Sequence, residues 1–310
     1  MKNFTKTESC VCTILFSISG IWLLCDKIYL SYFAVSFSKT LFFSWMGCDI
    51  ISASESIYRK VSKMLELRNI SFSVPQEGGK GANTKEIIQD VSFTIDTGKF
   101  VAITGPNGGG KSTLAKIIAG IERPTSGQIL FDGKDITDMS ITERAKTGIG
   151  FAFQQPVRFK GITVKDLIRL ATGENMTTAS ACEFLSEVGL CARDYINREV
   201  NGSLSGGELK RIEIATVMAK KSRLTVFDEP EAGIDLWSFG NLIQVFEKMH
   251  EEIKGSILII SHQERILNIA DQIIVIADGK VVQNGSKDEI LPVLLNAPAP
   301  SCKFYATERK

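Results

Sequence analysis

Hydrophobic and polar residues alternate along two stretches near the start of the patterned part of the chain, residues 65–74 and 87–95. The apolar positions of the first stretch are Leu65, Leu67, Ile70, Phe72 and Val74. Alternation with a period of two is typical of strands that bury one face. The glycine-rich segment 75–84 separates the stretches, so the pattern predicts two strands joined by a loop.

Short runs of consecutive apolar residues recur along the rest of the chain, at 100–104, 128–131, 149–153, 224–227, 257–260 and 273–276. Segments with helical periodicity separate several of these runs, including the one that begins near Leu114 and the one at 236–251. Strands that alternate with helices favour a mostly parallel sheet with helices on both faces. We therefore expect an α/β fold.

Between residues 163 and 218 the apolar positions repeat with the period of a helix. The positions expected to face inward are Leu167, Leu170, Phe184, Leu185 and Val188. No strand pattern interrupts this stretch. It predicts an all-helical subdomain, at about 157–218, inserted into the α/β domain.

Residues 1–63 differ in composition from the rest, because they hold four of the seven cysteines and none of the eight prolines. Their apolar runs, 11–25, 28–37 and 41–48, are shorter than the ~20 residues of a membrane-spanning helix. We favour the hypothesis that this segment is a spurious upstream extension, since the first strand begins at Met64. A short or tilted membrane anchor and a signal peptide are the alternatives. The predicted domain covers 64–295, and the tail 296–310 is expected to fray.

The charges nearly balance, with 36 lysines and arginines against 35 acidic residues. A chain without a basic excess has no bulk field for a nucleic-acid backbone, so we expect no nucleic-acid partner. The seven cysteines lie at irregular spacings, which disfavours a zinc site or a disulfide framework. A reducing cytoplasm is the expected compartment.

A glycine-rich segment between the strand at 100–104 and the following helix satisfies the pattern G-x-x-x-x-G-K-[ST]. Its residues are Gly105, Pro106, Asn107, Gly108, Gly109, Gly110, Lys111, Ser112 and Thr113. Glycines let backbone N–H groups turn toward phosphate oxygens, and the helix N-terminus favours an anion. Lys111 is expected to reach the terminal phosphates of a bound nucleotide, and the Ser112 hydroxyl to complete the coordination of Mg²⁺.

Two adjacent carboxylates follow the apolar run 224–227. A buried strand that ends in this way can direct Asp228 toward Mg²⁺ and Glu229 toward a water molecule in line with the terminal phosphate. Together with Lys111, this pair predicts hydrolysis of a bound nucleotide, with Glu229 as the general base. A module that only senses nucleotide is disfavoured, because it would not need the base.

A second candidate anion site consists of Ser205, Gly206 and Gly207, just before the helical stretch 208–220. This site and the phosphate loop of the same chain cannot easily bind one nucleotide together. The two motifs resemble the ATP-binding cassette ATPases, in which the serine-glycine loop of one protomer closes over the ATP of the other. The resemblance implies a P-loop core with an antiparallel β subdomain and an inserted α-helical subdomain. It also implies a homodimer that forms on ATP binding.

Further family elements occur in the expected order. By this resemblance, Gln154 joins the helical subdomain to the Mg²⁺ site, and Asp235, in the loop 232–235, crosses the dimer interface. His262 matches the histidine that contacts the terminal phosphate. The other histidine, His250, is expected to be a solvated helix residue.

Several stretches resemble one branch of the family, the ATPase of the Suf iron–sulfur cluster assembly system: 151–157, 205–214, 233–235 and 262–267. That branch is cytoplasmic, and its ATP-driven dimer reshapes a scaffold of partner proteins. Val74 stands where a transporter ATPase often places an aromatic residue against adenine.

Pro230, in contrast, is typical of transporters. The alternative is therefore the ATPase subunit of an ABC transporter, membrane-peripheral and bound to a separate permease. In either case the segment 157–160 (Val157, Arg158, Phe159, Lys160) is the predicted partner contact.

Overall fold

The computed structural model describes residues 63–75, 84–173, 176–252 and 255–296. The predicted extension 1–63, apart from Lys63, and the tail 296–310, apart from Asn296, lie outside the described residues. Among the described residues, no helix combines the length and the apolar content that a membrane span requires.

The first of two sheets is antiparallel and has the strand order β2-β1-β4-β5. Its strands are β1 (Lys63–Pro75), β2 (Thr84–Asp96), β4 (Ser126–Phe131) and β5 (Lys134–Asp135). Leu65 pairs with Ile95 on one side and with Phe131 on the other. The pattern-based prediction of two strands around a glycine-rich segment is confirmed, and β5 was not predicted.

The second sheet has six strands in the order β10-β9-β3-β8-β7-β6. These are β3 (Phe100–Thr104), β6 (Ile149–Ala152), β7 (Leu224–Asp228), β8 (Ser256–Ile260), β9 (Gln272–Ala277) and β10 (Lys280–Ser286). All neighbouring pairs are parallel except β9 with β10. Every residue of β3, β7 and β8 is buried, as the continuous apolar runs predicted for a sheet covered on both faces.

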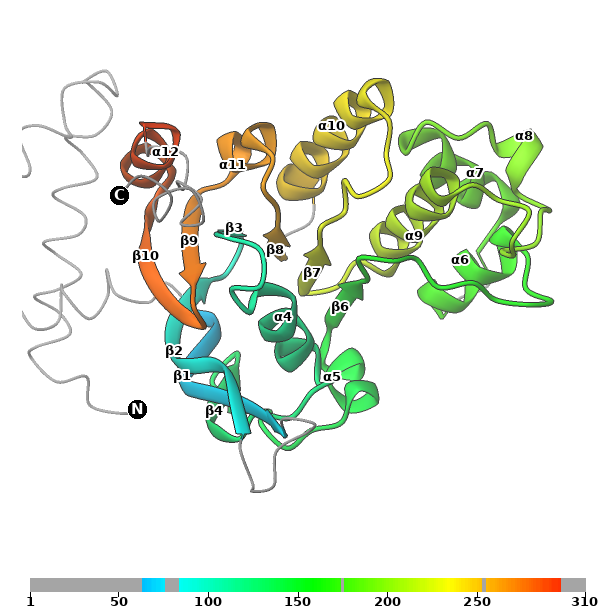
Figure 1. Cartoon of the computed structure of the whole chain (residues 1–310). Coiled ribbons are helices and arrows are strands. Elements are labelled where there is room, and N and C mark those ends of the chain that lie inside the picture. The colour runs from blue at the N-terminus through cyan, green and yellow to red at the C-terminus, as the bar shows by residue number, and fades with distance from the viewer. Residues whose placement is uncertain (1–62, 76–83, 174–175, 253–254, 297–310) are drawn as a thin grey trace, which may run out of the picture. The chain divides into compact units, whose positions relative to one another are not determined.

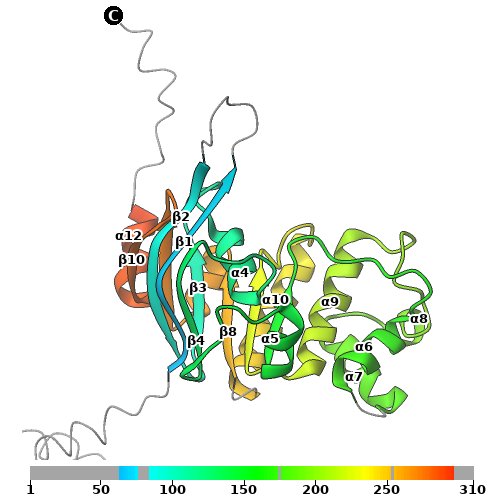
Figure 2. The ribbon, with the colours of Figure 1, turned by 90° about the horizontal axis from the view of Figure 1, so that it is seen from below.

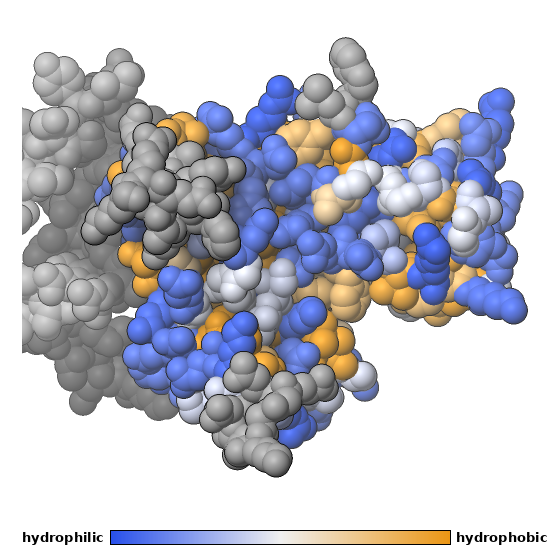
Figure 3. All heavy atoms as spheres, in the orientation of Figure 1, coloured by the Kyte–Doolittle hydropathy of each residue, from blue (hydrophilic) through white to orange (hydrophobic). Residues whose placement is uncertain are grey.

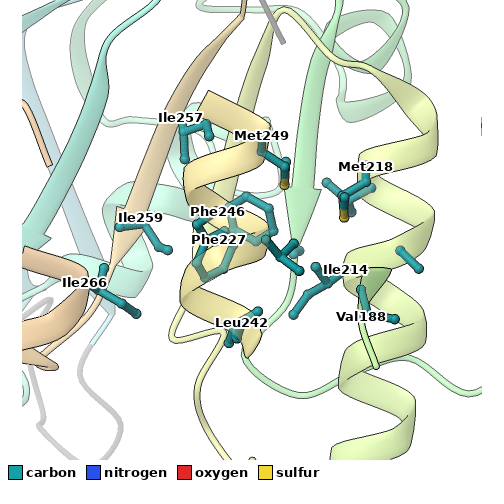
Figure 4. Packing of buried hydrophobic residues seen from close by; sticks show 14 of the residues in the cluster. Val188, Ile214, Met218, Phe227, Leu242, Phe246, Met249, Ile257, Ile259 and Ile266 are labelled. Carbon is teal, nitrogen blue, oxygen red and sulfur yellow. The ribbon is translucent and has the colours of Figure 1, made fainter. Parts of the chain in front are cut away.

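The two faces of this sheet belong to separate hydrophobic clusters. Val101 and Ile103 pack with α4 (Lys111–Ala119) and the antiparallel sheet, whereas Phe100 and Ala102 pack on the opposite side. That side is covered by α10 (Leu236–Glu252), α11 (Glu264–Ile269) and α12 (Lys287–Asn296) (Figure 1). Phe227 of β7 and Phe246 of α10 meet edge to face, with ring centroids 5.0 Å apart (Figure 4). Each face therefore has its own core.

A group of helices lies beyond β6 and β7 (Figure 1), away from the antiparallel sheet (Figure 2). They are α6 (Val164–Thr172), α7 (Thr178–Glu187), α8 (Ala192–Tyr195) and α9 (Gly206–Lys220). The helical character predicted for 163–218 is confirmed, while the subdomain boundary at 157–218 stays a prediction.

One inward position predicted in this region is wrong, because Leu170 is 70% exposed. Helix α6 buries Val164 and Ile168. Leu170 follows Ile168 by two residues, or about 200° around the helix, and so points away from that face. Leu185 and Val188 are buried as predicted, and Leu167 and Phe184 pack against the same core from partly exposed positions.

Candidate functional site

Several strands of the parallel sheet end at one edge, and the predicted site residues follow directly after these ends. Phe227 pairs with Ala152 on one side and with Ile259 on the other, so β6, β7 and β8 end side by side. Gln154, Glu229 and His262 lie within two residues of those strand ends. The register of the sheet therefore brings together residues that are far apart in the sequence.

The phosphate loop connects β3 to α4, and its backbone requires glycine. Gly105, Gly108 and Gly110 have φ of 134°, 77° and 96°, a region that residues with a side chain rarely adopt. A Cβ atom on Gly105 would lie 1.9 Å from the carbonyl oxygen of Ile276, which is a severe clash. Any side chain at Gly105 would thus displace the loop.

Lys111 is the first residue of α4 and is only 4% exposed. Its Nζ donates hydrogen bonds to the carbonyl oxygens of Gly105 at 2.8 Å and Pro106 at 2.9 Å. Burial lowers the pKa of Lys111, and the charges of Glu229 and Asp228 oppose that shift. The ammonium group is therefore held over the loop, beside two carboxylates.

Ser112 and Asp228 are in direct contact, since the Ser112 hydroxyl donates a 2.9 Å hydrogen bond to Asp228 Oδ1. Asp228 is the last residue of β7 and is 2% exposed. Burial raises the pKa of Asp228, and the nearby charge of Glu229 adds to the shift, while the Ser112 hydrogen bond opposes it. A buried carboxylate in this state is stabilised by any cation that binds beside it.

Glu229 lies at the centre of the site. Its backbone has φ of 45°, unusual for a residue with a side chain, and its N–H donates to the Ile260 carbonyl at 3.0 Å. Gln154 Nε2 donates to Glu229 Oε2 at 2.6 Å. His262 Nε2 lies 4.0 Å from Glu229 Oε1, and burial together with the charge of Lys111 lowers the pKa of His262.

Lys111, Ser112, Gln154 and Glu229 line a cleft of about 350 Å³. It is lined by Ile87, Asn107, Gly108, Gly110, Lys111, Ser112, Thr113, Gln154 and Glu229. None of these lining residues, all in the described part of the chain, is aromatic, and Val74 is not among them.

The serine-glycine loop does not contribute to the lining of this cleft. Ser205 instead caps the N-terminus of α9, where its N–H donates to Glu208 Oε2 at 2.6 Å and its hydroxyl accepts from the Glu208 N–H at 3.3 Å. Gly207 packs close to the carbonyl of Gly233. Asp235 accepts hydrogen bonds from the N–H and the hydroxyl of Ser238. Within one chain, then, the two predicted anion sites remain separate.

One acidic residue beside the site was missed by the sequence analysis. The Ser261 hydroxyl donates to Glu231 Oε1 at 2.5 Å, and Glu231 Oε2 is buried without a hydrogen-bond partner. Burial raises the pKa of Glu231. The sequence signal was a third carboxylate two residues after Glu229, which is indistinguishable from a surface residue without the fold.

The prediction for His250 was wrong, because this side chain is partly buried rather than solvated. Its Nε2 lies 3.4 Å from Asp271 Oδ2, and its ring meets that of Phe100 edge to face. The helix pattern missed this because Asp271 and Phe100 reach His250 only through the packing of α10 on the sheet.

Several known proteins are similar to this chain in sequence and in fold. The family model described as ABC transporter matches residues 88–232. An uncharacterized ABC transporter ATP-binding protein of Methanocaldococcus jannaschii is 40% identical over 66% of this chain and 85% of its own length. The chain belongs to the ATP-binding cassette family. It is accordingly an ATP-binding enzyme that hydrolyses ATP.

A further relative and a solved structure support the same family assignment for this ABC ATPase. The probable ATP-dependent transporter ycf16 of Cyanophora paradoxa is 32% identical over 73% of this chain and 90% of its own length. A solved ATP-binding cassette, dimeric and bound to ADP and Pi in a post-hydrolysis state, has a TM-score of 0.65 and 26% identity. That comparison covers 72% of this chain and 99% of the solved one. The predicted P-loop fold with an antiparallel sheet is confirmed.

Proposed function

We propose that this ATPase is the nucleotide-binding subunit of an ABC transporter, bound at the cytoplasmic side of a separate membrane permease. The relatives reported above include transporter ATP-binding proteins, and a sulfate/thiosulfate import ATP-binding protein of Synechococcus elongatus is also 36% identical over 66% of this chain and 60% of its own length. The observation that carries the proposal is an apolar groove next to the loop that contains Gln154.

The groove has a volume of about 160 Å³ and lies between the end of β6 and helices α6 and α9. Its apolar lining includes Phe151, Phe153, Leu167 and Ile212. Val157 and Phe159, at its rim, are 43% and 36% exposed. Most of the described surface in Figure 3 is hydrophilic, and hydrophobic residues form only small separate patches. An apolar segment of a partner would remove Val157 and Phe159 from water.

In the proposed mechanism, the phosphate loop and Lys111 hold the terminal phosphates of ATP. Glu229 accepts the proton of the attacking water, because its carboxylate faces the cleft and is oriented by Gln154 at 2.6 Å. His262, which lies near the other carboxylate oxygen of Glu229, contacts the terminal phosphate. The lowered pKa of His262 keeps its imidazole neutral near pH 7, so its ring N–H can donate to a phosphate oxygen.

The donor set fits Mg²⁺. The Ser112 hydroxyl and the Asp228 carboxylate are adjacent oxygen ligands, and Gln154 lines the same cleft. Mg²⁺ prefers oxygen ligands. Water molecules and phosphate oxygens of the nucleotide usually supply several of these ligands, so one or two protein ligands are sufficient. We propose Ser112, Asp228 and Gln154 for this site. The ion, when bound, neutralises the charge of the phosphate oxygens.

The same proposal includes a homodimer that forms on ATP. Ser205, Gly206 and Gly207 stand at the N-terminal end of a 15-residue helix, which favours an anion, yet they do not line the cleft of their own chain. A second copy can present them to the phosphates from outside. Asp235, next to this loop through Gly233, would lie at the same interface.

The catalytic role is tested with Glu229→Gln, which keeps the shape of the side chain but removes the base. We expect ATP turnover to fall by about 100-fold or more while ATP binding is retained, so the variant accumulates as an ATP-bound dimer. Size-exclusion chromatography with ATP and phosphate-release assays measure both effects. Glu247→Gln, an exposed glutamate of α10, is the control. Unchanged turnover in Glu229→Gln would refute the assigned role.

The partner is tested by capture from detergent-solubilised native membranes with the tagged full chain, followed by mass spectrometry. We expect a membrane permease, and we expect Val157→Asp with Phe159→Asp to release it. Leu170→Asp is the matched control, because Leu170 is an exposed apolar residue of the helical region outside the groove. Equal capture by all variants would exclude the groove as the contact.

A soluble Suf-type scaffold is the second candidate partner, since Glu208, Lys210 and Glu213 match that branch in sequence. The reported relatives do not support it. Scaffold proteins recovered in the same capture experiment, in place of a permease, would establish it.

A further inference from the structure

Helix α9 carries a lysine that is completely removed from solvent. Lys210 has 0% exposure, although a lysine is almost never fully buried unless its charge is paired. Its Nζ donates hydrogen bonds to the carbonyl oxygens of Phe153 and of Gln154, the latter at 3.4 Å. Glu213 Oε2 lies 3.2 Å from the same nitrogen. Two main-chain carbonyls thus accept hydrogen bonds from the ammonium group, and the Glu213 carboxylate balances its charge as an ion-pair partner.

Glu213, one turn further along α9, contacts the main chain of the same segment. Its Oε1 accepts a 2.9 Å hydrogen bond from the N–H of Phe153. Burial raises the pKa of Glu213, and the charge of Lys210 opposes this shift. Both polar groups of the Phe153 main chain are therefore bound by one buried ion pair.

This pair is poorly explained by stability alone. Removing two charges from water is so unfavourable that apolar residues of similar size often stabilise a protein equally well or better. What the pair adds is a fixed position for one short segment, because its hydrogen bonds beyond the pair itself go to the main chain of residues 153 and 154. Gln154 in turn holds Glu229 at 2.6 Å.

We propose that Lys210 and Glu213 are positioning residues for hydrolysis, which lock the main chain at Gln154 to helix α9 and so set the place of Gln154 against Glu229. The inference rests on the proposed role of Gln154. Glu213 and Phe153 also line the apolar groove, so an occupant of the groove contacts the pair directly. The Lys210–Glu213 pair thereby couples occupancy of the groove to the orientation of Glu229.

The decisive experiment measures kcat and the dissociation constant for ATP of Lys210→Met, alone and combined with Gln154→Ala. Because small misplacements at a reacting centre have large effects, we expect Lys210→Met to lower kcat by about tenfold or more. The dissociation constant should change by less than about threefold, since the phosphate loop lies on other elements. In the Gln154→Ala background, Lys210→Met should change kcat by less than about twofold.

A second variant separates positioning from folding. Lys210→Met with Glu213→Met replaces the pair by apolar side chains, so its unfolding temperature should equal or exceed that of Lys210→Met alone. Its kcat should nevertheless stay low, because the contacts with residues 153 and 154 are still missing. Recovery of kcat together with stability would show that the pair has only a structural role.

Lys220→Met is the matched control. Lys220 is on the same helix and also donates to a main-chain carbonyl, that of Ile149, at the opposite end of β6. We expect an unchanged kcat. Equal losses in Lys220→Met and Lys210→Met, or multiplicative effects of Lys210→Met and Gln154→Ala, would overturn the proposal. If Gln154→Ala alone left kcat unchanged, the role of Gln154 in the proposed function would be wrong instead.

Discussion

At the scale of single residues, the cleft contains groups whose environment opposes their charge. Lys111 and Asp228 are both buried, and burial shifts the pKa of each toward the neutral form. Glu229 adopts a backbone conformation that is costly for a residue with a side chain. Such features lower the stability of the nucleotide-free chain. Phosphates and a cation that bind in the cleft would favour the charged forms of these side chains, so the same features favour binding.

Asp228→Asn should therefore stabilise the chain in the absence of nucleotide. Because the pKa of Asp228 is raised in the folded state, the folded chain binds more protons than the unfolded chain just above pH 4, and ionisation destabilises the fold as the pH rises. The amide avoids this loss, so we expect a gain of about 1 kcal/mol at pH 7. The gain should shrink as the pH falls toward 4.

Denaturant unfolding at several pH values measures this effect. Asp194→Asn, at an exposed position of α8, is the control. The prediction fails if Asp228→Asn is no more stable than the parent chain at pH 7. ATP hydrolysis should be lost in the same variant, since the carboxylate proposed as a Mg²⁺ ligand is gone.

At the scale of elements, helix α4 is anchored at both ends. Its N-terminus continues the phosphate loop, and its C-terminus is bound by Arg144 of α5 (Ile141–Thr147). The Arg144 guanidinium donates to the carbonyl oxygens of Ile117 at 2.6 Å and Ile118 at 2.9 Å. A cation at the C-terminus of a helix also interacts favourably with the helix dipole. The position of the phosphate loop thus depends on α5, which comes later in the sequence, after strands β4 and β5.

Arg144→Met should destabilise the fold strongly. Burial lowers the pKa of Arg144 to about 10, so the side chain is still charged at pH 7, and it also donates to the carbonyls of Thr137 and Met139. Methionine would leave these buried acceptors without a donor, which costs about 3 kcal/mol. Urea unfolding measures the loss. Arg193→Met, on the exposed side of α8, should be neutral, and an equally neutral Arg144→Met would contradict this interpretation.

The elements also show where sequence patterns are insufficient. The strands with continuous apolar runs were predicted, because full burial leaves a strong signal. Strand β10 was not, since it lies at the sheet edge and alternates between exposed and partly exposed positions. Helix α12 was missed as well, and Pro292 in its interior is a residue that normally disfavours a helix.

At the scale of the whole molecule, the separation of Ser205 from the cleft predicts that activity depends on two chains. A mixture of Lys111→Ala chains and Ser205→Phe chains can form heterodimers in which one of the two sites has both residues intact. Each variant alone should be inactive. Mixing should restore activity, up to roughly a quarter of that of the parent if the sites act independently and the chains pair at random.

Phosphate release, measured as a function of the mixing ratio, tests this prediction. A mixture of Lys111→Ala chains with Lys111→Ala, Ser205→Phe double-variant chains is the control, because no dimer in it contains an intact site. The absence of any recovery in the first mixture, with both variants folded and able to associate, would contradict a site shared between chains.

The amino-acid sequence alone determined the phosphate loop, the acidic pair after the apolar strand and the alternation of strands and helices, because each is local and depends on residue types at short spacing. The tertiary structure decided which of the candidate residues meet. Gln154 and Glu229 come into contact because β6 and β7 are hydrogen-bonded in register, and Lys210 reaches Gln154 because α9 packs beside that strand end. Contacts of this kind depend on the packing of distant segments, which patterns at short spacing in the sequence do not predict.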